Sequence, residues 1–358
     1  MRSWSWSVFL VAISACGFPR PPDVPDDGSD AAGCYGSFVR ICFSTPPTTL
    51  VALTENTDID TDASPICDQQ NDQMTHYCVV AGAGFTSTKK ISAHGSKPLV
   101  LLSTTTMVLA GEIDVSSNHN GSQPRGAGAN PLLCTNTIPA TGASGGFGGS
   151  FGGKGGDGEQ TDGTRGTAAP ALLSFPAVLR GGCPGGAGSP TGTGGAGGSG
   201  GGAVALIAAE LRLDGRINAS GAGGRGGPAS KSGGGGGGSG GMIVLDTPSI
   251  VLGANGLLFA NGGGGGQGGA GIGGNGPGPG DDGSESTGPQ ISASGGLNGN
   301  RDGGYGGPGS AGSARTTGAN ADGNVTGNGG GGAGGGAAGF IRAHGLTGAI
   351  VAPPSSEP

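Results

Sequence analysis

Three aspartates at alternate positions, Asp58, Asp60 and Asp62, are the residues of this sequence best suited to hold a metal ion. Carboxylates at this spacing supply the oxygen ligands of a Ca²⁺ loop. An EF-hand loop also needs glycine at its sixth position and glutamate at its twelfth. Ala63 and Gln69 stand there instead. The pattern therefore favours a solvated strand face, with a calcium site as the weaker alternative and no other cofactor indicated.

A second charged pattern consists of Arg212, Asp214 and Arg216, which alternate with apolar residues. A protein that binds or cleaves polysaccharide needs charged side chains grouped on one face, so these three residues form a candidate glycan contact. Outward positions of half-buried strands are normally polar. A solvated strand face is accordingly the simpler interpretation.

No catalytic constellation can be assembled from the sequence. None of the four histidines, His76, His94, His119 and His344, pairs with a serine and an acid in a recognisable nucleophile motif. Gly-x-Gly-x-x-Gly matches are numerous only because glycine is abundant, and none lies between a strand and a helix. We therefore expect no enzymatic activity and assign no catalytic residue.

The chain begins with a predicted export signal. Residues 1–15 combine one positive charge, a short apolar run and small residues, which is typical of a secretory signal peptide. The stretch from Ile13 to Cys16 resembles a bacterial lipobox, in which the cysteine becomes the lipidated first residue of the mature protein. Gly17 follows it, where an aspartate would resemble an inner-membrane retention signal. We expect a lipid anchor at Cys16 in the outer membrane or at the cell surface, the alternative being a plain secretory signal with an incidental cysteine.

The six remaining cysteines form an even set, which in an exported chain predicts three disulfides. Fifteen pairings are open to six cysteines. The simplest joins neighbours, namely Cys34–Cys42, Cys67–Cys78 and Cys134–Cys183. A metal site is a weaker interpretation, because no Cys-x-x-Cys pair is present.

Composition excludes several classes of protein. With 89 glycines and 24 prolines among 358 residues, the chain cannot be one ordinary close-packed enzyme domain. The net charge of −7 and the absence of a basic stripe make nucleic acid an unlikely partner. Residues 16–33 are rich in proline and aspartate and predict an extended tether between the membrane and the folded part.

The apolar residues are concentrated in segments that can be aligned as repeats, at 99–117, 203–220, 242–261 and 339–352. Gly111, Gly215, Gly256 and Gly348 coincide in the alignment, and an apolar residue follows each of them two positions later. We expect two short strands and a glycine corner per copy, with a bulge near residues 254–255. Such units bury their apolar face only by stacking. The predicted fold class is all-β, a short right-handed parallel β-helix or a closely similar solenoid.

Glycine-rich inserts at 120–201, 221–241 and 262–338 separate these copies. They either remain disordered coil or form three-residue-per-turn polyglycine II helices that pack side by side. Residues 34–98 are expected to form a disulfide-stapled head with the first rungs, and 99–358 the remaining rungs and inserts. Alternation at Ile91 and Ala93 indicates one such early rung.

Several of these stretches resemble glycine-rich, PGRS-like surface lipoproteins of myxobacterial type. The matching segments are 34–43, 180–189, 240–247 and 259–267. The rungs are also similar to those of filamentous-haemagglutinin-type adhesins and pectin-lyase-like β-helices. The resemblance implies an exported surface protein with a structural, matrix or adhesive role, whose partners are a membrane, extracellular polysaccharide or other surface proteins. A carbohydrate-active β-helix and a largely disordered secreted protein are the alternatives.

Overall fold

A computed structural model describes the chain over residues 33–71, 75–120, 124–135, 137–189, 193–272, 277–297, 302–312, 315–323, 325–343 and 351–352. Every regular element within these ranges is a β-strand, so the described protein is all-β. The predicted signal peptide, the lipidation site Cys16 and nearly all of the tether lie outside the described residues.

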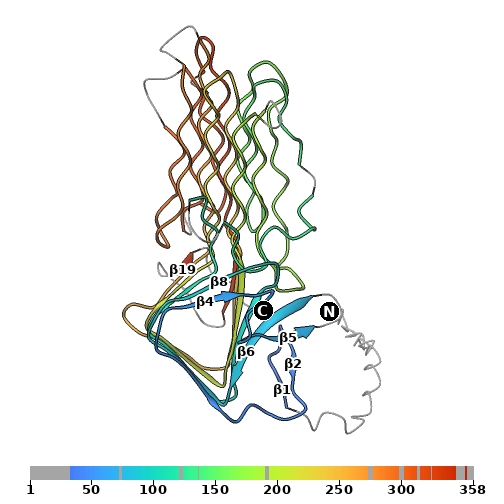
Figure 1. The fold of residues 1–358 in the computed structure, drawn as a ribbon, viewed down its shortest axis with the longest axis vertical. Coiled ribbons are helices and arrows are strands. Elements are labelled where there is room, and N and C mark those ends of the chain that lie inside the picture. The colour runs from blue at the N-terminus through green and yellow to red at the C-terminus, as the bar shows by residue number, and fades with distance from the viewer. Residues whose placement is uncertain are drawn as a thin grey trace, which may run out of the picture.

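Most strands belong to three sheets, which we call sheets I, II and III (Figure 1). Sheet I contains, in spatial order, β18 (Phe340–Ala343), β15 (Met242–Asp246), β12 (Ala203–Ile207), β9 (Leu99–Ser103), β6 (His76–Gly82) and β5 (Asp68–Asn71). Sheet II contains β16 (Ile250–Leu252), β13 (Glu210–Leu213), β10 (Thr106–Leu109), β7 (Gly84–Ser87) and β3 (Leu50–Leu53). Sheet III contains β19 (Val351–Ala352), β17 (Leu257–Phe259), β14 (Arg216–Asn218), β11 (Glu112–Asp114), β8 (Ile91–His94) and β4 (Thr57–Asp60).

From β6 to β17, consecutive strands visit sheets I, II and III in turn, and neighbours within a sheet come from successive sequence repeats. All pairs in the three sheets are parallel except β5 with β6. Ile113 pairs with Ile217, and Ile217 with Leu258, as the repeat alignment predicts. Ile91 also pairs with Ile113, so the early copy belongs to the same series.

Three details of the predicted repeat are wrong. The copies at 99–117, 203–220 and 242–261 each contribute three strands rather than two, because the chain bends at the glycine corner, as at Gly111 between β10 and β11. Residues 254–255 form a turn between β16 and β17, not a bulge. In the last copy Val351, rather than Ile350, pairs with Leu258. Val351 lies three residues after Gly348, whereas Leu258 lies two residues after Gly256. The distance from the aligned glycine therefore does not set the register of the last copy.

The main hydrophobic core receives side chains from all three sheets. On β13 and β14, Leu211, Leu213 and Ile217 are buried, whereas Arg212 and Arg216 between them are exposed. This is the period-two alternation expected of strands with one buried face. The stacked equivalents Leu101, Leu206, Leu245, Met107 and Ile113 lie in the same core.

The central strands of sheet I, β9, β12 and β15, are buried on both faces, and they consequently read as apolar runs such as Leu99–Leu102. The second face of sheet I packs against Val39 and Ile41 of the antiparallel hairpin formed by β1 (Cys34–Tyr35) and β2 (Ile41–Cys42). It also packs against Phe151 and Leu179 of the first glycine-rich insert. This second cluster brings the head and the insert onto the same face of the sheet.

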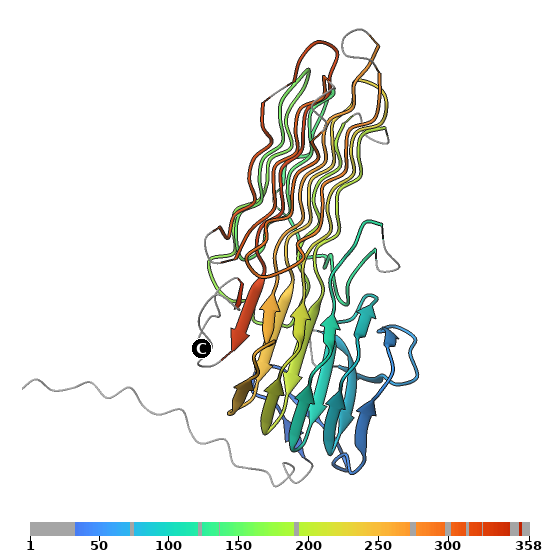
Figure 2. The same cartoon turned by 90° about the vertical axis from the view of Figure 1, so that its left-hand side faces the viewer.

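The three glycine-rich inserts all leave sheet III and return to sheet I. They connect β11 to β12, β14 to β15, and β17 to the β18 region. Their extended tracts lie side by side in a bundle at one end of the strands (Figures 1 and 2). The tracts are therefore ordered against one another wherever the structure describes them.

Hydrogen bonds in the bundle repeat every third residue. In the tract 233–241, residues 234, 237 and 240 donate backbone N–H groups to carbonyls at 331, 334 and 337. A second set of donors, at 235, 238 and 241, bonds to the carbonyls of 225, 222 and 219. A third set, at 233, 236 and 239, bonds to the carbonyls of 189, 186 and 183. The same tract accepts from residues 146 and 149, from 195, 198 and 201, and from 263 and 266. Six neighbouring stretches thus surround it.

Glycine is required by the close approach of these backbones. A Cβ atom on Gly236 would overlap the carbonyl oxygen of Phe147, and one on Gly145 would overlap the carbonyl oxygen of Gly332. The high glycine content therefore allows the backbones of neighbouring tracts to pack in direct contact.

Candidate binding site

The three aspartates of the predicted calcium site do not converge. Asp58 and Asp60 lie on β4, where the Oδ2 of Asp58 is 3.6 Å from Nε2 of His94. Asp62 accepts hydrogen bonds from the backbone N and Oγ of Ser96 at 2.7 and 2.5 Å. Among the described residues, no group of three His, Cys, Asp or Glu side chains could hold a metal ion.

The three residues of the predicted glycan contact lie on different sides of the molecule. Arg212 belongs to β13 of sheet II and pairs with Glu210 at 2.7 Å, whereas Arg216 belongs to β14 of sheet III and pairs with Glu112 at 2.9 Å. Asp214, at the corner between them, accepts a hydrogen bond from the backbone N of Asn255 at 3.0 Å. The corner at Gly215 separates the charges that the linear pattern brings together.

All six predicted disulfide cysteines are paired, and each joins its neighbour in the chain. Cys34–Cys42 closes the β1–β2 hairpin. Cys67–Cys78 ties the loop before β5 to β6. Cys134–Cys183 joins two parts of the first insert that are 49 residues apart in sequence.

A charged cluster surrounds His119, the residue that directly precedes the first insert. Nδ1 of His119 lies 2.5 Å from Oε1 of Glu285, and Nε2 lies 3.3 Å from Oδ2 of Asp282. Arg225 of the second insert donates to Asp282 at 2.8 Å and to the carbonyl of His119 at 2.5 Å. Burial acts to raise the pKa of Glu285, but the hydrogen bonds and the attraction of His119 outweigh burial, so this pKa is lowered. The cluster therefore joins the start of the first insert to the second and third inserts.

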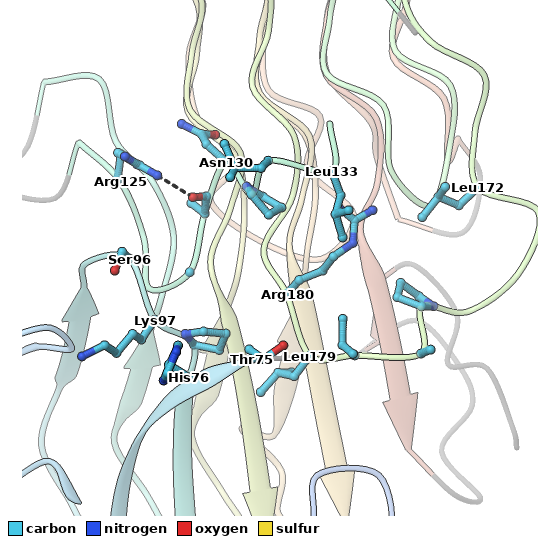
Figure 3. A pocket seen from close by; sticks show the side chains of 18 residues that line it. Thr75, His76, Ser96, Lys97, Arg125, Asn130, Leu133, Leu172, Leu179 and Arg180 are labelled. Carbon is cyan, nitrogen blue, oxygen red and sulfur yellow. Dashed lines mark hydrogen bonds between the residues drawn. The ribbon is translucent and has the colours of Figure 1, made fainter. Parts of the chain in front are cut away.

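A cavity of about 930 Å³ lies beside sheet I and is here called the Arg180 cavity (Figure 3). It is lined by the start of β6, by residues 96–98 just before β9, by Arg125 and the segment 128–133, and by Leu172 with the segment 176–180. Its walls are mainly apolar and include Pro131, Leu132, Leu133, Leu172, Pro176 and Val178.

Local geometry explains how the segment 128–133 reaches this position. Gly128 and Asn130 have φ angles of 69° and 55°, in the left-handed region that glycine and asparagine tolerate. The Asn130 backbone N donates to the carbonyl of Gly182 at 3.0 Å, and the Gly181 N donates to that of Gly128. Cys134–Cys183 lies just beyond these bonds, so both cavity-forming segments are fixed to each other.

Arg180 is the unusual residue of this cavity. It is only 8% exposed, and its guanidinium carbon lies 4.5 Å from the ring centroid of the buried Phe151. Its Nη1 is buried and has no hydrogen-bond partner among the described residues. Burial without an ion pair lowers the pKa of Arg180. Desolvating a cation without an anion costs free energy, so the site favours an incoming negative group.

Sequence reasoning did not identify Arg180 or its cavity. A usable signal was present, since residues 170–180 form an apolar island that ends in arginine within an otherwise glycine-rich insert. Only the folded chain shows that this island faces a second one, Pro131–Leu133.

Comparisons with known proteins add no family. Neither a scan against protein-family models nor searches of curated proteins and of solved structures gave a match. Over the described part of the chain, no helix has the length and apolar character needed to cross a membrane.

Proposed function

We propose that this protein is an exported, lipid-anchored surface protein with a structural, matrix or adhesive role and no catalytic activity. The observation that carries the proposal is the hydrogen-bonded bundle of glycine tracts around residues 233–241. Because the inserts are hydrogen-bonded to one another through their backbones, we expect them to form a rigid body rather than mobile loops around an active site. The lipobox-like stretch ending at Cys16 supplies the anchor in this proposal.

We further propose that the three sheets are the sides of a short right-handed parallel β-helix. Three observations support this assignment: the strands pair in parallel, the strands from β6 to β17 visit the three sheets in turn, and all three sheets contribute side chains to one core. The inserts would be polyglycine II helices, which have three residues per turn. The three-residue period of donors and the six neighbouring stretches of 233–241 support this part.

Labelling of intact cells tests the location. With a membrane-impermeant reagent, we expect the wild type to be labelled and retained on the cells, and Cys16→Ser to be released into the medium. Equal release of both proteins would contradict the lipid anchor.

An assay on extracellular polysaccharide tests the role. We expect the purified protein to release no sugar, and to be retained by cell-surface or matrix material. Sugar release that Asp214→Asn abolishes would overturn the non-catalytic role. Asp58→Asn is the matched control, because Asp58 is an exposed carboxylate on another rung.

A further inference from the structure

The Arg180 cavity combines two features that point to one chemical class of ligand. Its leucines are exposed to an unusual degree, with Leu132 at 99%, Leu133 at 66% and Leu172 at 42%. Its volume of about 930 Å³ lies within the range of roughly 300–1,000 Å³ usual for small-molecule sites. An exposed apolar surface in a recess of this size favours a hydrocarbon ligand over a sugar.

The second feature is the charge that faces this apolar wall. Lys97 and Arg125 also line the cavity, but Lys97 donates to Oε1 of Gln69 at 2.6 Å and Arg125 donates to the carbonyl of Ala129 at 2.8 Å. Within the described part of the chain, Nη1 of Arg180 has no such partner, and the guanidinium stacks on Phe151. In Figure 3 its side chain extends toward Leu133. One buried cation beside an apolar wall therefore remains to be neutralised.

We propose that the Arg180 cavity binds a single-chain anionic amphiphile, with its oxyanion headgroup at Arg180 and its hydrocarbon chain along Leu133 and Leu172. The planar guanidinium suits carboxylate and phosphate alike, because both can accept two parallel N–H bonds. The apolar wall removes the chain from water, which adds free energy with each buried methylene.

Titration calorimetry with the full chain tests this site. The probes are dodecanoate and dodecyl phosphate, each kept below its micelle-forming concentration, with dodecyltrimethylammonium as the cationic control. We expect one-to-one binding of at least one anionic probe and no binding of the cation. The tighter of the two anions identifies the headgroup as carboxylate or phosphate. No binding of either anion, or equal binding of the cation, would overturn the proposal.

Variants then locate the site. Arg180→Met should weaken binding by at least about tenfold, because the charge-assisted bonds are lost. Its melting temperature should not fall, since the variant removes an unpaired buried charge. Leu133→Asn, at an exposed position, should weaken the binding of the dodecyl probes but leave folding intact. Arg212→Met removes an exposed arginine on sheet II and should change nothing. Equal affinity of Arg180→Met and wild type would refute the headgroup site, even if Leu133→Asn binds more weakly.

Discussion

At the scale of single residues, the protein treats its buried charges in two ways. His119 is enclosed by Glu285 and Asp282, so the charges of that cluster have partners from other inserts. Arg180 has an aromatic ring and an apolar cavity instead. A paired cluster holds segments together, whereas an unpaired cation favours a ligand. This difference is why we assign a structural part to the first and a binding part to the second.

The carboxylate of Glu285 should make stability depend on pH. Its folded-state pKa is lowered, so its contribution is present above the ordinary value of 4.5 and is lost as pH falls through the lowered pKa. At pH 7 we expect Glu285→Gln to reduce the free energy of unfolding by about 1–3 kcal/mol. Urea unfolding between pH 3 and 7 should show the difference from wild type shrinking below about pH 4.5. Glu55→Gln, at an exposed carboxylate, is the control and should show no such difference; a pH-independent loss in Glu285→Gln would contradict the assignment.

At the scale of elements, one carboxylate makes several of the hydrogen bonds that hold the N-terminal hairpin on sheet I. Asp246, at the end of β15, accepts hydrogen bonds from the backbone N and Oγ of Ser37 at 2.6 and 2.8 Å and from the backbone N of Phe38 at 2.8 Å. Arg342 also lies over the ring of Phe38, 5.0 Å from its centroid. The segment between β1 and β2 is thereby attached to strands more than two hundred residues away.

We expect Asp246→Asn to loosen this attachment. An amide cannot accept all the bonds that the carboxylate accepts, and we estimate a loss of about 1.5–3 kcal/mol. Hydrogen exchange should become faster in residues 34–42 while sheet III remains protected. Unchanged exchange in the hairpin would show that apolar packing at Val39 and Ile41 is sufficient.

The glycine tracts give a second prediction at this scale. Gly236→Ala places a methyl group against the carbonyl of Phe147, and we expect the free energy of unfolding to fall by roughly 1–3 kcal/mol or more. Gly323→Ala is the matched control, because its Cβ would lie 3.7 Å from the nearest atom, Oε1 of Glu159. It should be neutral or slightly stabilising. Equal stability of the two variants in thermal melts would mean that the tracts are not packed as described.

At the scale of the whole molecule, the disulfides differ in how much chain they close. Cys134–Cys183 spans 49 residues and Cys34–Cys42 spans 8. Loop-closure entropy predicts losses of about 4 and about 2.5 kcal/mol when each is replaced by serines. Denaturant unfolding of the Cys134→Ser/Cys183→Ser and Cys34→Ser/Cys42→Ser proteins should therefore rank the longer loop as more important. The reverse order would show that residual structure in the unfolded chain dominates.

The alternation of apolar and polar residues predicted the strands but not the Arg180 cavity. Alternation at Leu211, Leu213 and Ile217 predicted which side chains are buried, since each strand has one face in the core. The same reading grouped Arg212 with Arg216, which the corner at Gly215 places on different sheets. The Arg180 cavity needs segments that lie about 50 residues apart in sequence, so no local spacing could reveal it.

Sequence by itself determined the strand-forming repeats, the even set of cysteines and the glycine content that permits close backbone packing, because these depend on residue type and short-range periodicity. Tertiary structure decided the three-strand division of the first three copies, the partner of Val351, the order of the glycine tracts and the burial of Arg180 without an anion. These depend on which distant backbones meet, and glycine tracts of nearly uniform composition carry little information about their partners.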